Sequence, residues 1–90
     1  MSQAKFSLGR LVATSNAVTH ITPTDVAAAL HRHLLGDWGD LDAEDRAANE
    51  AALVHGTRLF SAYHAVNGTK FYIITEWDRS VTTILLPEDY

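Results

Sequence analysis

The sequence predicts an α+β fold in which two helices pack on one face of a three- or four-stranded antiparallel sheet that ends in a β-meander. The first observation is a pair of segments with helix start and stop signals, at residues 22–35 and 42–55. The second is a change to alternating hydrophobicity in runs that are rich in β-branched and aromatic residues, at 59–66, 71–77 and 81–86. Because the chain has 90 residues and no Pro/Gly-rich linker, we expect one domain over residues 1–90.

Capping residues bound both predicted helices. Thr22 offers a hydroxyl N-cap, and Pro23 follows at the first helical position, where no N–H is missed. Asp42 caps the second helix, and Gly56 ends it. Asn49 is a poor helix former, so we expect its amide to have a hydrogen-bonding partner. Small residues dominate the predicted buried stripe of the second helix, which comprises Ala47, Ala48, Ala51, Ala52 and Val54.

Turn residues set the expected register of the sheet. Asn67-Gly68 favours a two-residue type I′ turn, and that turn places Ala62 opposite Ile73 in the first hairpin. A second tight turn places Ile73 opposite Ile84. Because side chains alternate between the two faces of a strand, this register also decides which residues point toward the helices.

The predicted sheet face away from the helices carries a mixture of aromatic, aliphatic and polar side chains. Its expected members are Ser61, Tyr63, Lys70, Tyr72, Ile74, Glu76, Val81, Thr83 and Leu85. Such a face is either a contact surface for a partner or a second copy, or is covered by the N-terminal segment 6–14. That segment is expected to be a short strand or a packed arm.

Charge is unevenly distributed along the chain, whose formal net charge is -4. Residues 36–50 contain six acids and one base, a net of -5, and residues 76–90 contain four acids and one base, a net of -3. The remainder therefore sums to +4. Acidic patches repel phosphate and favour basic surfaces, which argues against direct binding of nucleic acid. There is no cysteine and no apolar run near the roughly 18 residues that cross a bilayer, so we expect a cytoplasmic protein without disulfides.

Few residues suggest catalysis or metal binding. His31 and His33 lie two positions apart on a helix and point to different faces, so we expect no metal site and no cofactor. Ser61 has no acid or histidine expected on its own face. The alternative function is a small ribonuclease-type toxin with four candidate residues: Arg58, His64, Glu76 and Arg79. In the predicted register His64 and Glu76 point to opposite faces, which opposes this alternative.

A series of motifs occupies the C-terminal part of the chain: Gly36-Asp37-Trp38-Gly39, Asp45 with Asn49, Ser61-Ala62-Tyr63, Ile73 to Ser80, Thr82-Thr83 and Leu85 to Tyr90. Together they resemble a family of small uncharacterised bacterial proteins of plasmids and integrative elements, often labelled "plasmid-related". The resemblance covers roughly residues 36–90 and implies an origin on a mobile element. It implies no established activity.

The leading hypothesis is therefore a non-enzymatic acidic interaction protein of a mobile genetic element. Its expected partner is a protein with a basic surface, and its concrete form is an anti-defence inhibitor of a CRISPR or restriction complex. The acids would steer association, and the aromatic residues would anchor the partner. The expected partner-binding residues are Asp37, Trp38, Asp40, Asp42, Glu44, Asp45, Tyr63 and Tyr72.

Overall fold

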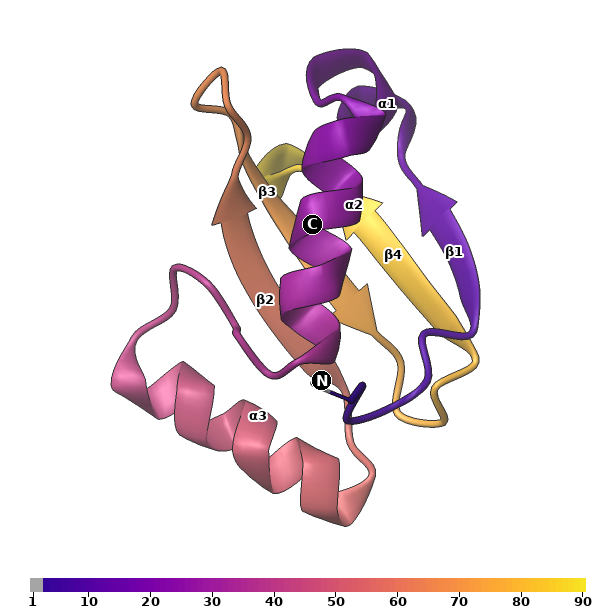
Figure 1. The fold of residues 1–90 in the computed structure, drawn as a ribbon, viewed down its shortest axis with the longest axis vertical. Coiled ribbons are helices and arrows are strands. Elements are labelled where there is room, and N and C mark those ends of the chain that lie inside the picture. The colour runs from indigo at the N-terminus through magenta and orange to yellow at the C-terminus, as the bar shows by residue number, and fades with distance from the viewer. Residues whose placement is uncertain (1–2) are drawn as a thin grey trace.

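Residues 3–90 are described in the computed structural model, and Figure 1 shows how their elements are arranged. In chain order the elements are β1 (Arg10–Ala13), α1 (Ser15–His20), α2 (Pro23–Leu34), α3 (Ala43–His55), β2 (Leu59–His64), β3 (Lys70–Thr75), β4 (Val81–Leu85) and a 3-10 turn η1 (Pro87–Asp89). The predicted α+β class is confirmed. No helix among these residues is long and apolar enough to cross a membrane.

The sheet is mixed, with strand order β1-β4-β3-β2. The predicted meander of β2, β3 and β4 is antiparallel, but β1 runs parallel to β4, with Arg10 beside Val81 and Ala13 beside Ile84. The expectation of a purely antiparallel sheet was therefore wrong. Three helices and the strands β2 and β3 separate β1 from β4 in the sequence, and no local pattern in residues 6–14 indicates which strand that segment joins.

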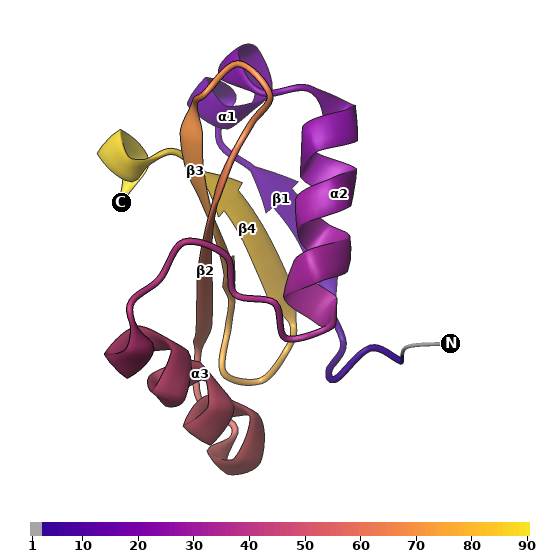
Figure 2. The same ribbon diagram turned by 60° about the vertical axis from the view of Figure 1, so that its left-hand side comes forward.

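The helices do not form one layer. Helix α2 lies across one face of the sheet, where Val26 and Leu30 pack on the core (Figures 1 and 2). Helix α3 instead lies against the outer edge of β2, near the end of the strand where the chain enters the sheet. The prediction that two helices share one face of the sheet is thus not confirmed. Helix α1 was not predicted; Thr14 is its N-cap, and the Thr14 hydroxyl accepts the N–H of Ala17 at 3.1 Å.

Local signals placed the ends of α2 and α3 correctly. The Thr22 hydroxyl accepts the N–H of Asp25 at 3.1 Å, and the Asp42 carboxylate accepts the N–H of Asp45 at 2.8 Å. Gly56 ends α3 with a φ of 70°, a left-handed conformation that suits glycine. These contacts lie within a few residues of one another in the sequence, so they were readable from it.

The buried side of α3 differs from the predicted stripe. Asn49 and Ala52 are buried, whereas Ala47, Ala48 and Ala51 are exposed. Val54, also expected in the stripe, is 79% exposed. The reason is the position of the helix, because an element that contacts the edge of one strand buries a narrower side than an element lying on a sheet face.

Register was predicted correctly for one hairpin and wrongly for the other. Ile73 lies opposite Ile84, as expected. In the first hairpin Ser61, not Ala62, lies opposite Ile73, which is a shift of one residue. The shift exchanges the two faces of β2: Leu59, Ser61 and Tyr63 point toward α2, and Phe60, Ala62 and His64 point away from it.

Loop length explains the shift. The N–H of Ala65 donates to the carbonyl of Thr69 at 2.9 Å, so the loop contains three residues, 66–68. A type I′ turn would need positive φ at Asn67 as well as at Gly68. Gly68 has a φ of 88°, but Arg79 is the only non-glycine residue with positive φ in the described chain. The hairpin therefore uses a three-residue loop with glycine in the left-handed position.

The N-terminal arm covers the α2 side of the sheet. The N–H of Lys5 donates to the carbonyl of Leu34 at 2.9 Å, and the Thr82 hydroxyl donates to the carbonyl of Leu8 at 2.7 Å. The arm therefore completes the core beside α2. The expected alternative, in which the arm covers the opposite face of the sheet, is not what the structure shows. That opposite face is partly covered by the C-terminal turn, from which Tyr90 reaches Phe60 at a ring distance of 6.0 Å.

Candidate interaction surface

Asp37 lies in the connection between α2 and α3 and is tied to the fold. Its carboxylate pairs with the Arg32 guanidinium through two bonds, Nε to Oδ2 at 2.7 Å and Nη2 to Oδ1 at 3.1 Å. Its carbonyl accepts the Tyr63 hydroxyl at 2.7 Å. The bond from Arg32 holds the pKa of the Asp37 carboxyl below its usual range. Asp37 thus holds the loop in place, and because Arg32 balances its charge, its carboxylate contributes little to the attraction of a partner.

Two of the expected partner anchors, Trp38 and Tyr63, are buried. Trp38 is 4% exposed, and its Nε1 donates to the Glu50 carboxylate at 2.8 Å. Tyr63 is 2% exposed, and its burial raises the pKa of the phenol to about 12. The expectation that these aromatic rings anchor a partner at the surface is therefore corrected: Trp38 fills the space beside α3, and the register shift turns Tyr63 toward α2.

The outer edge of β2 is closed by two groups from the preceding segment. The backbone of the loop pairs with Ala62, whose N–H donates to the carbonyl of Trp38 at 3.2 Å and whose carbonyl accepts the N–H of Asp40 at 2.8 Å. Asn49 pairs with Phe60 in the same way: its Nδ2 donates to the Phe60 carbonyl at 2.6 Å, and its Oδ1 accepts the Phe60 N–H at 3.0 Å. The Asn49 amide thus takes the place that a neighbouring strand would have beside Phe60. The backbone of Phe60 is therefore the hydrogen-bonding partner that was expected for Asn49.

All six acids of the acidic segment are exposed to solvent, and three of them, Asp40, Glu44 and Asp45, make no side-chain hydrogen bond or ion pair within the described chain. Asp42 serves as the N-cap of α3. Among the residues that the structure describes, the Arg32–Asp37 pair is the only salt bridge, so these three acids keep their charge without a cation partner. Glu44 and Asp45 lie in the first turn of α3, where the helix dipole favours negative charge.

A groove of about 340 Å³ lies between α3 and the face of the sheet that points away from α2. It is lined by Asp45, Ala48, Asn49, Arg58, Phe60, Tyr72 and Tyr90. The three aromatic rings form one cluster, with 4.7 Å between the centroids of Phe60 and Tyr72 and 6.0 Å from each ring to Tyr90. Arg58 closes one end, with its Nη2 donating to the Tyr90 hydroxyl at 3.2 Å. The groove therefore brings together two expected partner-binding residues from distant segments, Asp45 and Tyr72.

The sequence did not predict that Arg58, Phe60 and Tyr90 line this groove. The predicted register placed Phe60 in the core, because the first hairpin was given a two-residue loop. The signal was present: glycine at the third position of Val66-Asn67-Gly68 suits a three-residue loop with a left-handed last residue. No local pattern indicated that Tyr90 folds back onto the sheet.

A chain of buried hydrogen bonds crosses the core between α2 and the sheet. His33 Nδ1 lies 2.6 Å from the Ser61 hydroxyl, and His33 Nε2 lies 2.9 Å from the Thr75 hydroxyl. Thr75 continues the chain to Thr82 at 2.8 Å. Burial, and next the charge of Arg79, lower the pKa of His33 to about 4, so the imidazole is neutral at pH 7. Contrary to expectation, Ser61 does have a histidine partner, but both side chains are 0% exposed and meet no substrate.

The candidate nuclease residues do not converge. His64 and Glu76 point to the same face after the register correction, but they lie at opposite ends of the hairpin, about 20 Å apart along the strands. The Arg79 guanidinium is already bound to the carbonyls of Ala52 and Thr57, at 3.0 and 2.6 Å. These residues cannot surround one phosphate group. In residues 3–90 no cluster of three or more His, Asp or Glu side chains is placed to hold a metal ion.

Comparison of the chain with protein-family models, with curated proteins and with solved structures finds no match. The expected relationship to plasmid-related proteins therefore stays a prediction. Function is inferred from the geometry of the groove and from the charges around it.

Proposed function

We propose that this protein is a non-enzymatic binding module whose groove, together with the first turn of α3, contacts a basic surface of another protein. The observation that carries the proposal is the position of Asp45, an exposed acid of the acidic segment that lines the same groove as Tyr72. A cationic side chain that enters this groove can pair with the carboxylate and lie over an aromatic ring, two interactions that strengthen each other when water is excluded.

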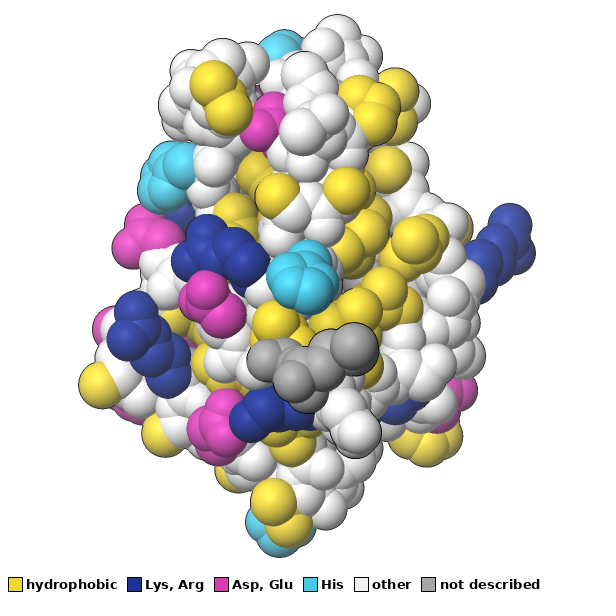
Figure 3. All heavy atoms as spheres, viewed as in Figure 1, with side chains coloured by type: hydrophobic (Ala, Val, Ile, Leu, Met, Phe, Trp, Pro, Cys, Tyr) yellow, Lys and Arg dark blue, Asp and Glu magenta, His cyan; other side chains and the backbone are white. Residues whose placement is uncertain are grey.

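Charge supports a basic partner. Asp40, Glu44 and Asp45 carry no salt bridge within the described chain, and they lie in a segment with a net charge of -5. Figure 3 shows acidic and basic side chains side by side over the α2–α3 connection, so the charge of this view is mixed and the attraction of a basic surface depends on the three acids without a partner. Unpaired surface charges of one sign attract an oppositely charged partner over a distance of about 10 Å at moderate ionic strength.

The concrete partner in this proposal is a phosphate-binding surface of a host-defence complex. A surface that binds phosphate is basic, and an acidic protein can occupy it in place of nucleic acid. The motif resemblance to plasmid-related proteins supports the same choice, since inhibitors of host defence travel on mobile elements.

A pair of matched double variants tests the proposal. Glu44→Lys with Asp45→Lys, and Glu76→Lys with Glu88→Lys, change the net charge equally, but only the first pair lies in the first turn of α3, where Asp45 lines the groove. The chain is used to capture its partner from a host-cell lysate, and the affinity of the purified partner for each variant is then measured at several salt concentrations. We expect the first double variant to weaken binding at least about tenfold and to reduce its salt dependence.

The second double variant is expected to bind within about threefold of the original chain. Circular dichroism confirms that each variant folds, since lysine near the start of α3 costs some helix stability. Equal losses in the two double variants would show that only net charge matters and would contradict the assigned surface. A captured partner that is itself acidic would contradict the proposal as well.

A further inference from the structure

β1 leaves one side of the sheet open. The N–H of Arg10 donates to the carbonyl of Ser80, and the N–H of Thr14 donates to that of Ile84, so the even-numbered residues of β1 bond to β4. The N–H and C=O groups of Leu11 and Ala13 therefore point away from the sheet. Within residues 3–90 no group bonds to them. The other edge of the sheet, β2, is closed by Asn49 and the α2–α3 connection, so β1 is the edge that can still pair.

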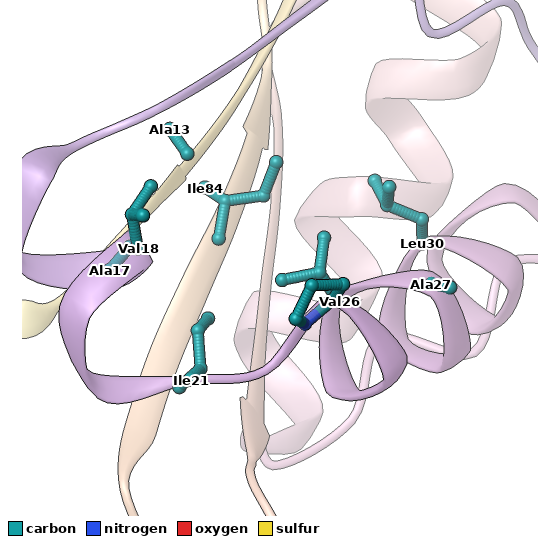
Figure 4. A pocket seen from close by; sticks show the side chains of 9 residues that line it. Ala13, Ala17, Val18, Ile21, Val26, Ala27, Leu30 and Ile84 are labelled. Atoms are coloured by element: carbon teal, nitrogen blue, oxygen red, sulfur yellow. The ribbon is translucent and has the colours of Figure 1, made fainter.

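Beside this edge lies an apolar groove of about 260 Å³, between the sheet and the helices α1 and α2. Its walls are Ala13, Ala17, Val18, Ile21, Pro23, Val26, Ala27, Leu30 and Ile84. Figure 4 shows these side chains around the hollow, and Figure 3 shows apolar atoms at the surface between α2 and β1. Leu11 is 49% exposed next to it. An open strand edge flanked by apolar surface is a site for strand pairing, which proteins otherwise block with charge, proline or a cover.

We propose that the occupant is a second copy of this chain, paired antiparallel through β1 about a two-fold axis at Val12. In the register that uses the free backbone groups, Leu11 of one copy forms a hydrogen-bonded pair with Ala13 of the second copy, and the reverse pair forms by symmetry. A large side chain then lies opposite a small one at the mouth of the apolar groove, because Ala13 lines that groove. The result is a continuous eight-stranded sheet.

Charge complementarity favours this occupant. The same register places Arg10 of one copy directly opposite Thr14 of the second copy, with both side chains on the sheet face away from α2. The Thr14 hydroxyl donates to the Asp89 carboxylate at 2.6 Å, and Asn16 holds its other oxygen at 2.8 Å. Figure 2 shows the C-terminal turn on the side of the sheet opposite α2. At each end of the paired strands, the exposed Arg10 of one copy therefore lies near the Asp89 carboxylate that Thr14 and Asn16 hold in the other copy.

The mass of the purified chain in solution tests the dimer. Light scattering and sedimentation over a concentration series up to about 1 mM are expected to show a mass twice the 9.9 kDa of the chain. Arg10→Glu places two like charges together and is expected to raise the dimer Kd at least about tenfold, with a smaller effect at high salt. Leu11→Lys places a charge on the open edge and is expected to give a monomer.

Lys70→Glu and Val66→Lys are the matched controls, because they make equal charge changes at exposed positions away from β1, and both are expected to leave the Kd unchanged. If Leu11→Lys fails to fold, the Kd of Arg10→Glu decides. A monomer at every concentration would overturn the proposal and leave an extended strand of another protein as the occupant of the edge. A dimer that forms equally well in both β1 variants would overturn it too. The test needs no partner, so it succeeds or fails independently of the proposed function.

Discussion

Acidification is expected to destabilise this protein through one side chain, His33. In the unfolded chain the imidazole has the ordinary pKa of 6.5, and in the fold burial lowers its pKa to about 4. Between these values the unfolded chain binds a proton that the folded chain excludes. The free energy of unfolding is therefore fully retained above pH 6.5 and falls as the pH drops toward 4. At 1.36 kcal/mol for each pH unit, the loss reaches about 3 kcal/mol.

This loss is large for a chain of 90 residues, whose free energy of unfolding is expected to be about 5–10 kcal/mol. The pH window also separates His33 from the carboxyl groups with lowered pKa, such as Asp25 and Asp37. Such groups contribute stability above their unfolded pKa near 4 and lose it only as the pH falls further. The slope between pH 6.5 and 4 is therefore expected to report mainly on the buried imidazole.

Urea unfolding of the chain at several pH values measures the slope. We expect His33→Gln to be less stable at pH 7 but to show little change between pH 6.5 and 4, whereas His31→Gln, an exposed neighbour on the same helix, keeps the slope of the original chain. If His33→Gln does not fold, NMR titration of the unmodified chain gives the pKa of His33 directly. A measured pKa above 6, or equal slopes in the original chain and His33→Gln, would refute the reasoning.

Two further predictions concern the closed edge of β2. Asn49→Leu is expected to lower the free energy of unfolding by about 1–2 kcal/mol, because it leaves the partly buried N–H and C=O of Phe60 unpaired. A loss below about 0.5 kcal/mol in urea unfolding would contradict this role. Gly39→Ala is expected to destabilise much more than Gly56→Ala, although both glycines have positive φ. A Cβ added at Gly39 would overlap with the carbonyl oxygen of Ala62, whereas a Cβ added at Gly56 meets nothing within 4 Å. Equal decreases in Tm for the two variants would contradict the close approach of Gly39 to Ala62.

Features set by neighbouring residues could be predicted from the sequence. The caps at Thr22 and Asp42 and the glycine at Gly56 depend on contacts within one turn of chain, and all three were placed correctly. The register of β3 with β4 was also correct. Asn49 was recognised as a residue that needs a partner, but the partner, the backbone of Phe60, depends on where α3 packs.

The errors come from one loop and from long-range packing. A loop with three residues in place of two moved every residue of β2 to the other face, so Tyr63 was expected on the surface and Phe60 in the core. The burial of Trp38 depends on α3 lying along the edge of the sheet, which no periodicity of the helix reveals. The pairing of β1 with β4 likewise involves segments that share no local signal. The groove could therefore be predicted only in part, through Asp45 and Tyr72.

The pairing of β1 with β4 has a consequence for folding during synthesis. β1 leaves the ribosome before the other strands of the sheet, but its neighbour β4 is the last of the four to be made, and Thr82 reaches back to Leu8 across 74 positions. At about 5–20 residues per second, β1 waits several seconds or more with both sides unpaired. The hairpins of β2, β3 and β4 need only short loops to close, so they are expected to form first and to offer β4 as the template on which the N-terminal strand finally docks.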